Sequence, residues 1–136
     1  NWNYVTQQTA DWDEATARTI TQSVIDSGKP FNVIYAENNG MARGAVAALD
    51  AAGITHGKGG DVIVMGFDSD KWAFEAVLEG SWNYMGLCNP LQADTVDGII
   101  KDLAAGKAPA QKIIYTPEQG FDCDTLTQAD VDTYGT

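Results

Sequence analysis

The sequence is poor in the residues that bind zinc, nucleic acids and membranes. It has one histidine, His56, and two cysteines far apart in the chain, too few ligands for a tetrahedral zinc site. Eight basic residues against 19 acidic ones give a net charge of −11, which leaves no basic surface for phosphate backbones or anionic lipids. Apolar runs are only a few residues long, far below the ~20 that span a bilayer. We therefore expect no metal, no cofactor, no nucleic acid and no membrane insertion.

What the sequence does contain is enough apolar residues for one folded domain, with 44% hydrophobic among 136. Short β-type runs alternate with segments of helical periodicity, which is typical of βα units on a parallel sheet. The predicted strands are 4–8, 31–36, 61–67, 82–88 and 112–116, and the predicted helices are 14–27, 41–52, 68–79, 91–105 and one that begins at 127. This order predicts an α/β fold with a mostly parallel sheet.

Three loops follow the first three predicted strands and carry polar or aromatic side chains. They are Asp11-Trp12-Asp13, Glu37-Asn38-Asn39 and Asp68-Ser69-Asp70. In an open α/β sheet, ligands bind beyond the carboxyl ends of the strands. Asn and Asp groups can bind neighbouring sugar hydroxyls, and an indole can cover the apolar CH face of a sugar ring. The loops therefore predict a carbohydrate site at one edge of the sheet.

Each loop also has an interpretation that involves no ligand. Asp13 and Asp70 stand where helix caps are common, and Asn39-Gly40 is typical of a turn. Trp12 could equally be a half-buried staple.

An enzyme is a further alternative, because a glycosidase needs two carboxylates, and Asp11, Glu37 and Asp68 could supply them. The chain has no Gly-x-Ser-x-Gly elbow and no Gly-x-Gly-x-x-Gly fingerprint, so we expect no catalytic residues.

Four segments resemble one family, in the correct order over roughly residues 7–110. Residues 33–49 (VIYAENNGMARGAVAAL) resemble the AxNDxMALGAxxAL segment of type I periplasmic sugar-binding proteins. Residues 64–68 (VMGFD) resemble the VxGFD strand end of that family, and residues 9–13 (TADWD) resemble its ADWD turn. Residues 87–91 (LCNPL) resemble the ECNPL element of its galactofuranose-type branch. Arg43 and Gly40 depart from the family pattern, and we place both on a helix surface.

The resemblance implies one lobe of a two-lobe protein, in which Rossmann-like, doubly wound lobes are joined by hinge strands and close on a sugar. It implies that Trp12 stacks on the sugar and that Asn38 and Asp68 are polar ligands. Cys88 stands at a hinge position where several relatives carry a sugar-binding Gln. The ligand-binding set that we expect is Asp11, Trp12, Asn38, Asp68 and Cys88. The whole protein would deliver a monosaccharide to an ABC permease from the periplasm or the outer surface of a bacterium.

The resemblance also divides the chain. Residues 1–88 form the core of the C-terminal lobe, and residues 89–136 form a hinge crossing, a helix that belongs to the missing N-terminal lobe, a returning strand and a tail. No secretory signal opens the sequence, so we expect a mature product or a fragment. The apolar face of helix 91–105 should then meet the missing lobe or a neighbouring chain; it comprises Val96, Ile99, Ile100 and Leu103.

Two expectations follow from the secreted branch of the family. Cys88 and Cys123 should form a disulfide, because both follow strands expected to end near the hinge and the compartment is oxidising. The effector domain of a lactose-repressor-type regulator shares the fold and remains the alternative function, ahead of a small α/β hydrolase. The acidic balance and the cysteine pair favour the secreted protein.

Overall fold

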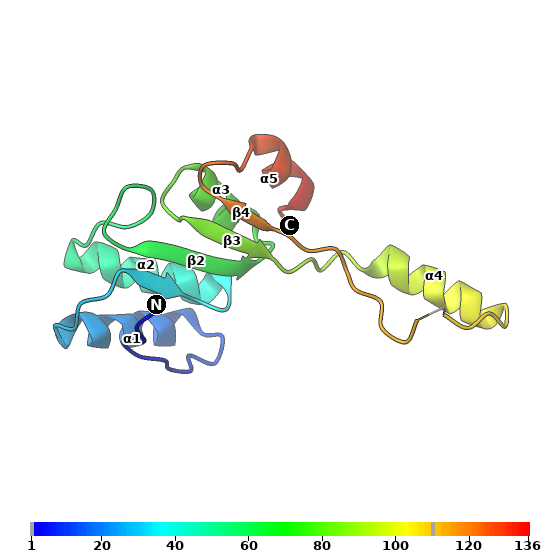
Figure 1. Cartoon of the computed structure of the whole chain (residues 1–136), viewed down its shortest axis with the longest axis horizontal. Helices are drawn as coiled ribbons and strands as arrows, with labels where there is room; N and C mark the ends of the chain where they lie inside the picture. The colour runs from blue at the N-terminus through cyan, green and yellow to red at the C-terminus, as the bar shows by residue number, and fades with distance from the viewer. Residues whose placement is uncertain (1, 110) are drawn as a thin grey trace.

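The computed structural model describes residues 2–109 and 111–136 (Figure 1). Its helices are α1 (Glu14–Asp26), α2 (Asn39–Ala52), α3 (Lys71–Leu78), α4 (Ala93–Ala104) and α5 (Gln128–Tyr134), and its strands are β1 (Val33–Tyr35), β2 (Ile63–Asp68), β3 (Tyr84–Leu87) and β4 (Gly120–Asp122). Within this described part, no helix combines the length and the apolar character that crossing a membrane requires.

The sheet has the order β1-β2-β3-β4, with parallel pairing from β1 to β3 and an antiparallel edge strand β4. The predicted α/β class with a mostly parallel sheet is confirmed. Both parallel crossovers step in the same direction along the sheet. Because such crossovers are right-handed, α2 and α3 lie on the same face. The other face carries a row of aromatic rings, with Tyr35 5.0 Å from Phe67 and Phe67 6.4 Å from Tyr84 between centroids.

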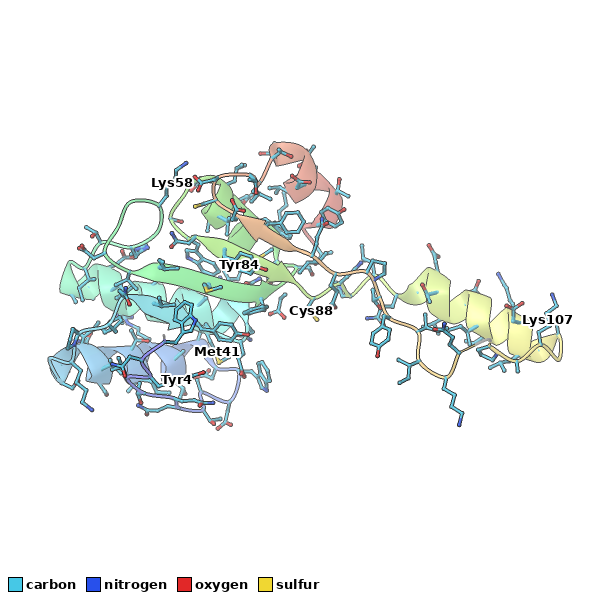
Figure 2. All side chains as sticks on the ribbon, viewed as in Figure 1. Tyr4, Met41, Lys58, Tyr84, Cys88 and Lys107 are labelled. Atoms are coloured by element: carbon cyan, nitrogen blue, oxygen red, sulfur yellow. The ribbon has the colours of Figure 1, made fainter. Side chains whose placement is uncertain are left out.

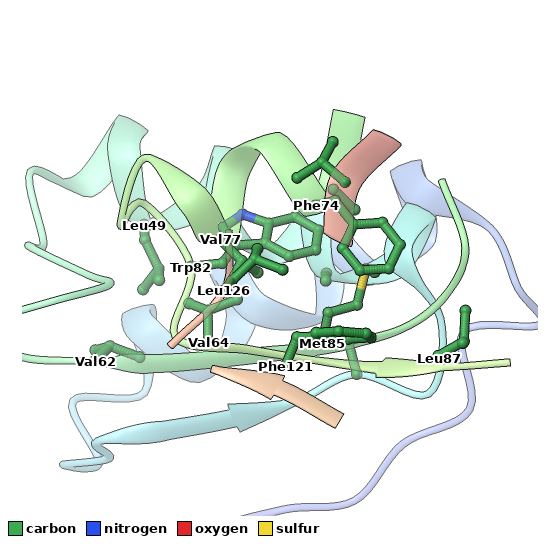
Figure 3. Packing of buried hydrophobic residues seen from close by; sticks show 14 residues of the cluster. Leu49, Val62, Val64, Phe74, Val77, Trp82, Met85, Leu87, Phe121 and Leu126 are labelled. Carbon is green, nitrogen blue, oxygen red and sulfur yellow. The ribbon is translucent and has the colours of Figure 1, made fainter. Parts of the chain in front are cut away.

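The core lies between the helix-covered face of the sheet and helices α2, α3 and α5 (Figure 3). Val64 and Met85 point into it from neighbouring strands and are fully buried. Phe74 of α3 packs edge to face against Phe121 of β4, with centroids 5.2 Å apart. The antiparallel strand therefore closes the end of the core that the parallel strands leave open.

Local signals set the helix ends much as predicted. The Asp13 carboxylate accepts the Thr16 backbone N–H at 2.7 Å, so Asp13 caps α1 as expected. Hydrogen bonds from Thr16 also lower the pKa of this carboxyl. Gly53 ends α2 in the left-handed conformation, with φ 67°, which glycine adopts without a steric cost. Thr127 and Asp130 form the predicted capping box at the start of α5.

Helices α1 and α2 cross in close contact at Gly44. A Cβ atom at this position would lie 2.1 Å from the backbone oxygen of Glu14. Arg43 strengthens the same crossing, because its Nε donates to Oε2 of Glu14 at 2.8 Å and its guanidinium lies 4.3 Å from the centre of the Trp72 ring. The first turns of α1 and α3 are thereby linked to the second turn of α2.

Two predicted strands are wrong. Residues 4–8 form no strand in the structure, and Tyr4 is almost fully exposed. This segment lies beside the last turns of α1, without pairing with the free edge of β1. Residues 112–116 also form no strand, although the run is apolar. The returning strand is β4, a few residues later, because the pairing partner of β3 is the segment that brings Phe121 onto the core.

Helix α4 stands apart from the rest of the chain. It matches the predicted helix 91–105, and Figure 1 shows it at the far end of two extended segments. None of its residues is buried, and Val96, Ile100 and Leu103 are 47%, 59% and 54% exposed. The expected apolar face is therefore present, and in the described structure Ile99 is half-buried while the other three side chains are exposed.

The predicted disulfide is wrong, because Cys88 and Cys123 are both free thiols. The reason is the direction of β4. The backbone N–H of Cys123 donates to Asn83, which precedes β3, whereas Cys88 follows the carboxyl end of β3. Cys123 therefore lies beside Asn83, and Cys88 lies five residues further along the extended chain. Five extended residues span about 16 Å, well beyond the reach of a disulfide.

Candidate functional site

The predicted site residues meet at one end of the sheet, where the parallel strands finish. Asn38 follows β1, Asp68 ends β2, and Cys88 follows β3. The backbone N–H of Cys88 donates to the carbonyl of Asp68 at 3.1 Å, so these two chain segments are adjacent. Figure 2 shows Cys88 where the chain leaves the body toward α4. The candidate site therefore lies where the chain leaves the sheet toward α4.

Trp12 reaches the same end through helix α1. It lies two residues before the first residue of α1, Glu14, whose carboxylate binds Arg43 near the start of α2. The Trp12 side chain is 66% exposed and is not a buried staple. Asp11 beside it is exposed as well. An indole face is therefore available to a ligand at the rim.

Three non-glycine residues of the described chain have a positive φ, and all three belong to the predicted site. They are Asp11 (φ 49°), Trp12 (φ 63°) and Asp68 (φ 124°). A bulky or branched side chain is rarely found in this conformation, which costs of order 1–3 kcal/mol. Such strain persists where the surrounding structure enforces it, and it is concentrated at ligand sites.

Asn38 is half-buried, and the oxygen of its side-chain amide is hydrogen-bonded within the protein. Its Oδ1 accepts the backbone N–H of Met41 at 2.7 Å and so caps α2. Among the described residues no acceptor binds its Nδ2 group. Asn38 therefore combines both interpretations, since the oxygen caps the helix while the two N–H donors can bind a ligand hydroxyl.

Asp68 is a partly buried carboxylate with a raised pKa. Burial is the main cause, and the negative charge of Asp70 adds to it, whereas the backbone N–H of Asn39 acts in the opposite direction from 3.4 Å. A carboxylate with little hydration is a strong acceptor for sugar hydroxyls. Glu37 lies at the same end but is exposed.

Sequence reasoning missed the role of Asn39 and misassigned Asp70. Asn39 is the fully buried first residue of α2, where a turn residue was predicted. Asp70 occupies the N-cap position of α3 but makes no capping hydrogen bond there, because its carboxylate accepts Nδ2 of Asn39 at 3.0 Å. No spacing rule links residues 31 positions apart, so only the fold reveals this pair.

The arrangement brings together an indole face, an amide with free donors and a poorly hydrated carboxylate. This combination can bind a polyol ring but includes no activated nucleophile. No group of three or more His, Cys, Asp or Glu side chains gathers as a metal site in the described ranges.

Residues 1–108 match the model of the periplasmic binding protein domain. The chain belongs to this family. The fructose import binding protein FruE of Bifidobacterium longum is 30% identical over 131 residues, which is 95% of this chain and 38% of that protein. This periplasmic binding protein domain thus spans well under half the length of that relative.

Solved structures agree with the family assignment. A protein from Mycobacterium smegmatis in complex with β-D-fucofuranose superposes with a TM-score of 0.78 and 27% identity, over 96% of this chain and 40% of that one. The arabinose transporter component of Shewanella sp. ANA-3, bound to α- and β-L-arabinofuranose, has a TM-score of 0.83 and 24% identity, over 96% of this chain and 43% of that one. The second likeness establishes the fold of the binding protein domain.

Replacing Asp68 with Asn should stabilise the chain slightly at neutral pH. The folded state raises the pKa of Asp68, so ionisation of this carboxyl costs stability as the pH rises through that pKa. Asn removes the poorly hydrated charge and keeps an acceptor for the Asn39 N–H. We expect a gain of less than about 1 kcal/mol at pH 7 that vanishes below the ordinary aspartate pKa of 3.8, measured by urea unfolding at pH 7 and below that value. A loss of stability at pH 7 would contradict it.

Proposed function

We propose that this chain is one lobe of a solute-binding protein that captures a monosaccharide for an ABC importer. The sugar binds at the carboxyl ends of the strands, with Trp12 on its apolar face and Asn38 and Asp68 on its hydroxyls. Asp11 and Cys88 complete the rim. The observation that carries this proposal is the meeting of an indole, a free amide and a poorly hydrated carboxylate at one end of the sheet, with strained backbone at two of the three.

The remaining part of the binding protein is a second lobe that closes on the same sugar. The chain spans 38% of its fructose-importing relative, which leaves room for such a lobe. Residues 1–88 then form the core of this lobe and residues 89–136 contain the hinge crossing, with α4 packed on the other lobe through its apolar face. A ligand favours a closed state only through contacts with both lobes. This lobe alone therefore binds sugar weakly.

The partners and location follow from the same proposal. The complete protein docks on an ABC permease and works in the periplasm or on the outer surface of a bacterium. The relatives are import binding proteins for sugars, including fructose and ribose. The acidic surface and the absence of a spanning helix in the described residues are compatible with that location.

The test is a titration of the ¹⁵N-labelled chain with D-fructose, D-ribose, L-arabinose and D-fucose. One of these sugars should shift the amide signals of Asn38 and Asp68 and the indole signal of Trp12, with a dissociation constant of about 1 mM or weaker because half of the contacts are absent. Trp12→Ala and Asp68→Ala should each weaken this binding about tenfold or more, since each removes a main contact.

The matched control is Trp2→Ala. Trp2 is also an exposed tryptophan, at 84%, and lies outside the proposed site. Its loss should leave the titration unchanged. If the sugars shift signals away from the rim, or if Trp2→Ala weakens binding as much as Trp12→Ala does, the proposed site is wrong.

A further inference from the structure

Asn39 holds both ends of the turn that carries Asp68. It is the first residue of α2, directly after the proposed sugar ligand Asn38. Its backbone N–H donates to Oδ2 of Asp68 at 3.4 Å, and its side-chain Nδ2 donates to Oδ2 of Asp70 at 3.0 Å. One residue thus contacts the turn between β2 and α3 at two points, from the loop that follows the neighbouring strand.

The side chain of Asn39 is fully buried, in an environment where an apolar residue would be expected. It is 0% exposed, and its Nδ2 also contacts Sδ of Met85 at 3.4 Å. Its Oδ1 is buried and has no hydrogen-bond partner among the described residues. A Cβ atom at Gly66 would lie 2.7 Å from this oxygen, so the glycine makes space for the amide. An orphaned buried acceptor is unfavourable, and such costs are tolerated where a group has another role.

The Asp70 carboxylate accepts a hydrogen bond from Asn39 and makes no capping hydrogen bond to its own helix. Asp70 stands at the N-cap of α3, but the Lys71 N–H donates instead to the Thr136 carbonyl at 3.2 Å, and the Ala73 N–H to the Asp70 carbonyl at 3.0 Å. Two charged groups act on it from neighbouring elements, namely Asp68 of β2 and Arg43 of α2, and the latter is attractive. The carboxylate can only accept, so the amide must present its N–H group to it.

We propose that Asn39 and Asp70 form a clasp that sets the distance and orientation between Asn38 and Asp68. The clasp joins the β1–α2 and β2–α3 connections across two parallel strands, and it holds Asp68 in its strained conformation. Asn39 and Asp70 are positioning residues that do not touch the sugar. The inference rests on the proposed function, because the two groups that it positions are proposed sugar ligands.

The first test is a charge exchange across the clasp. Asn39→Asp places two carboxylates about 3 Å apart, so the folding equilibrium constant should fall about tenfold or more at pH 7 and recover as the pH falls, when one of them binds a proton. The double variant Asn39→Asp with Asp70→Asn restores an amide–carboxylate hydrogen bond of reversed direction. It should recover part of the lost equilibrium constant and depend less on pH than Asn39→Asp does, because only one carboxylate remains in the pair, now at the fully buried position. Asn32→Asp, at an exposed asparagine, is the charge-matched control and should change little.

The second test measures the positions of Asn38 and Asp68 in the absence of sugar. It uses variants of Asp70, because these leave the buried Asn39 side chain unchanged. Asp70→Ala removes the acceptor and should shift the backbone amide signals of Asn38 and Asp68. Asp70→Asn keeps an acceptor oxygen and should leave these signals near their wild-type positions. In the titration described above, the best sugar should bind Asp70→Ala about tenfold more weakly than Asp70→Asn.

The outcomes separate the clasp from the sugar site. If Asn39→Asp behaves like Asn32→Asp, or if Asp70→Ala leaves the signals of Asn38 and Asp68 unmoved, the clasp is overturned. If the wild-type chain responds to none of the sugars while these signals move as expected, the proposed function fails and the clasp stands as a structural connection. If the double variant regains stability but not the signal positions, the positioning role is overturned.

Discussion

Gly44→Ala should lower the stability of the chain by about 2 kcal/mol and its melting temperature by roughly 5–10 °C. The added methyl group would lie 2.1 Å from the Glu14 oxygen and 3.2 Å from the Arg18 nitrogen, both backbone atoms that cannot move independently. Helices α1 and α2 must separate to admit it. Because Trp12 lies two residues before α1 and Asn38 directly precedes α2, the change should also move the indole away from the amide.

The measurements are thermal unfolding by circular dichroism and the amide spectrum of the folded chain. Gly98→Ala is the matched control, since Gly98 is also inside a helix, α4, but a Cβ atom there meets nothing within 4 Å. Alanine has the higher helix propensity, by about 1 kcal/mol, so this variant should gain helicity without loss of stability. Equal effects of the two substitutions would show that the α1–α2 crossing is not as close as described.

The largest contrast that we expect within the chain is in amide exchange. Amides of α4 should exchange at least about a thousandfold faster than those of β2 and β3. A helix of 12 residues with no buried side chain is marginally stable in water, whereas strand amides in the core open only on global unfolding. Trypsin should accordingly cleave first after Lys101 and Lys107, while the rest of the chain stays folded.

The control is the complete binding protein, in which we propose that α4 packs on the second lobe. There its amides should be protected and the tryptic sites resistant. A monomer in light scattering with a fully protected α4 would contradict the prediction. Protection that rises with protein concentration would instead show that the apolar face pairs with a second copy of the chain.

Much of this fold follows from local signals in the sequence. Runs such as 61–67 predict strands because their apolar residues are continuous, and the caps at Asp13 and Thr127 are chemical properties of those side chains. The segments resembling the binding protein family predict Trp12, Asn38 and Asp68 after strands, and the structure places all three at one end of the sheet although the strand before Trp12 is absent. These features depend on neighbours along the chain, which a sequence displays.

Pairing between distant segments is what local signals could not supply. Residues 112–116 are apolar enough for a strand, yet Gly120–Asp122 pairs with β3 because that register buries Phe121. The same antiparallel direction separates the two cysteines and removes the predicted disulfide. Residues 4–8 illustrate the converse case, in which a strand-like pattern remains unpaired.

Periodicity, caps and short motifs act over a few residues, so the α/β class, most of the helix ends and the family could be predicted from the sequence. The tertiary structure alone decided that β4 runs antiparallel, that α4 stands free and that Asn39 is buried against Asp70. Each of these is a contact between segments far apart in the chain, and its energy depends on burial and register, which exist only once the sheet has formed.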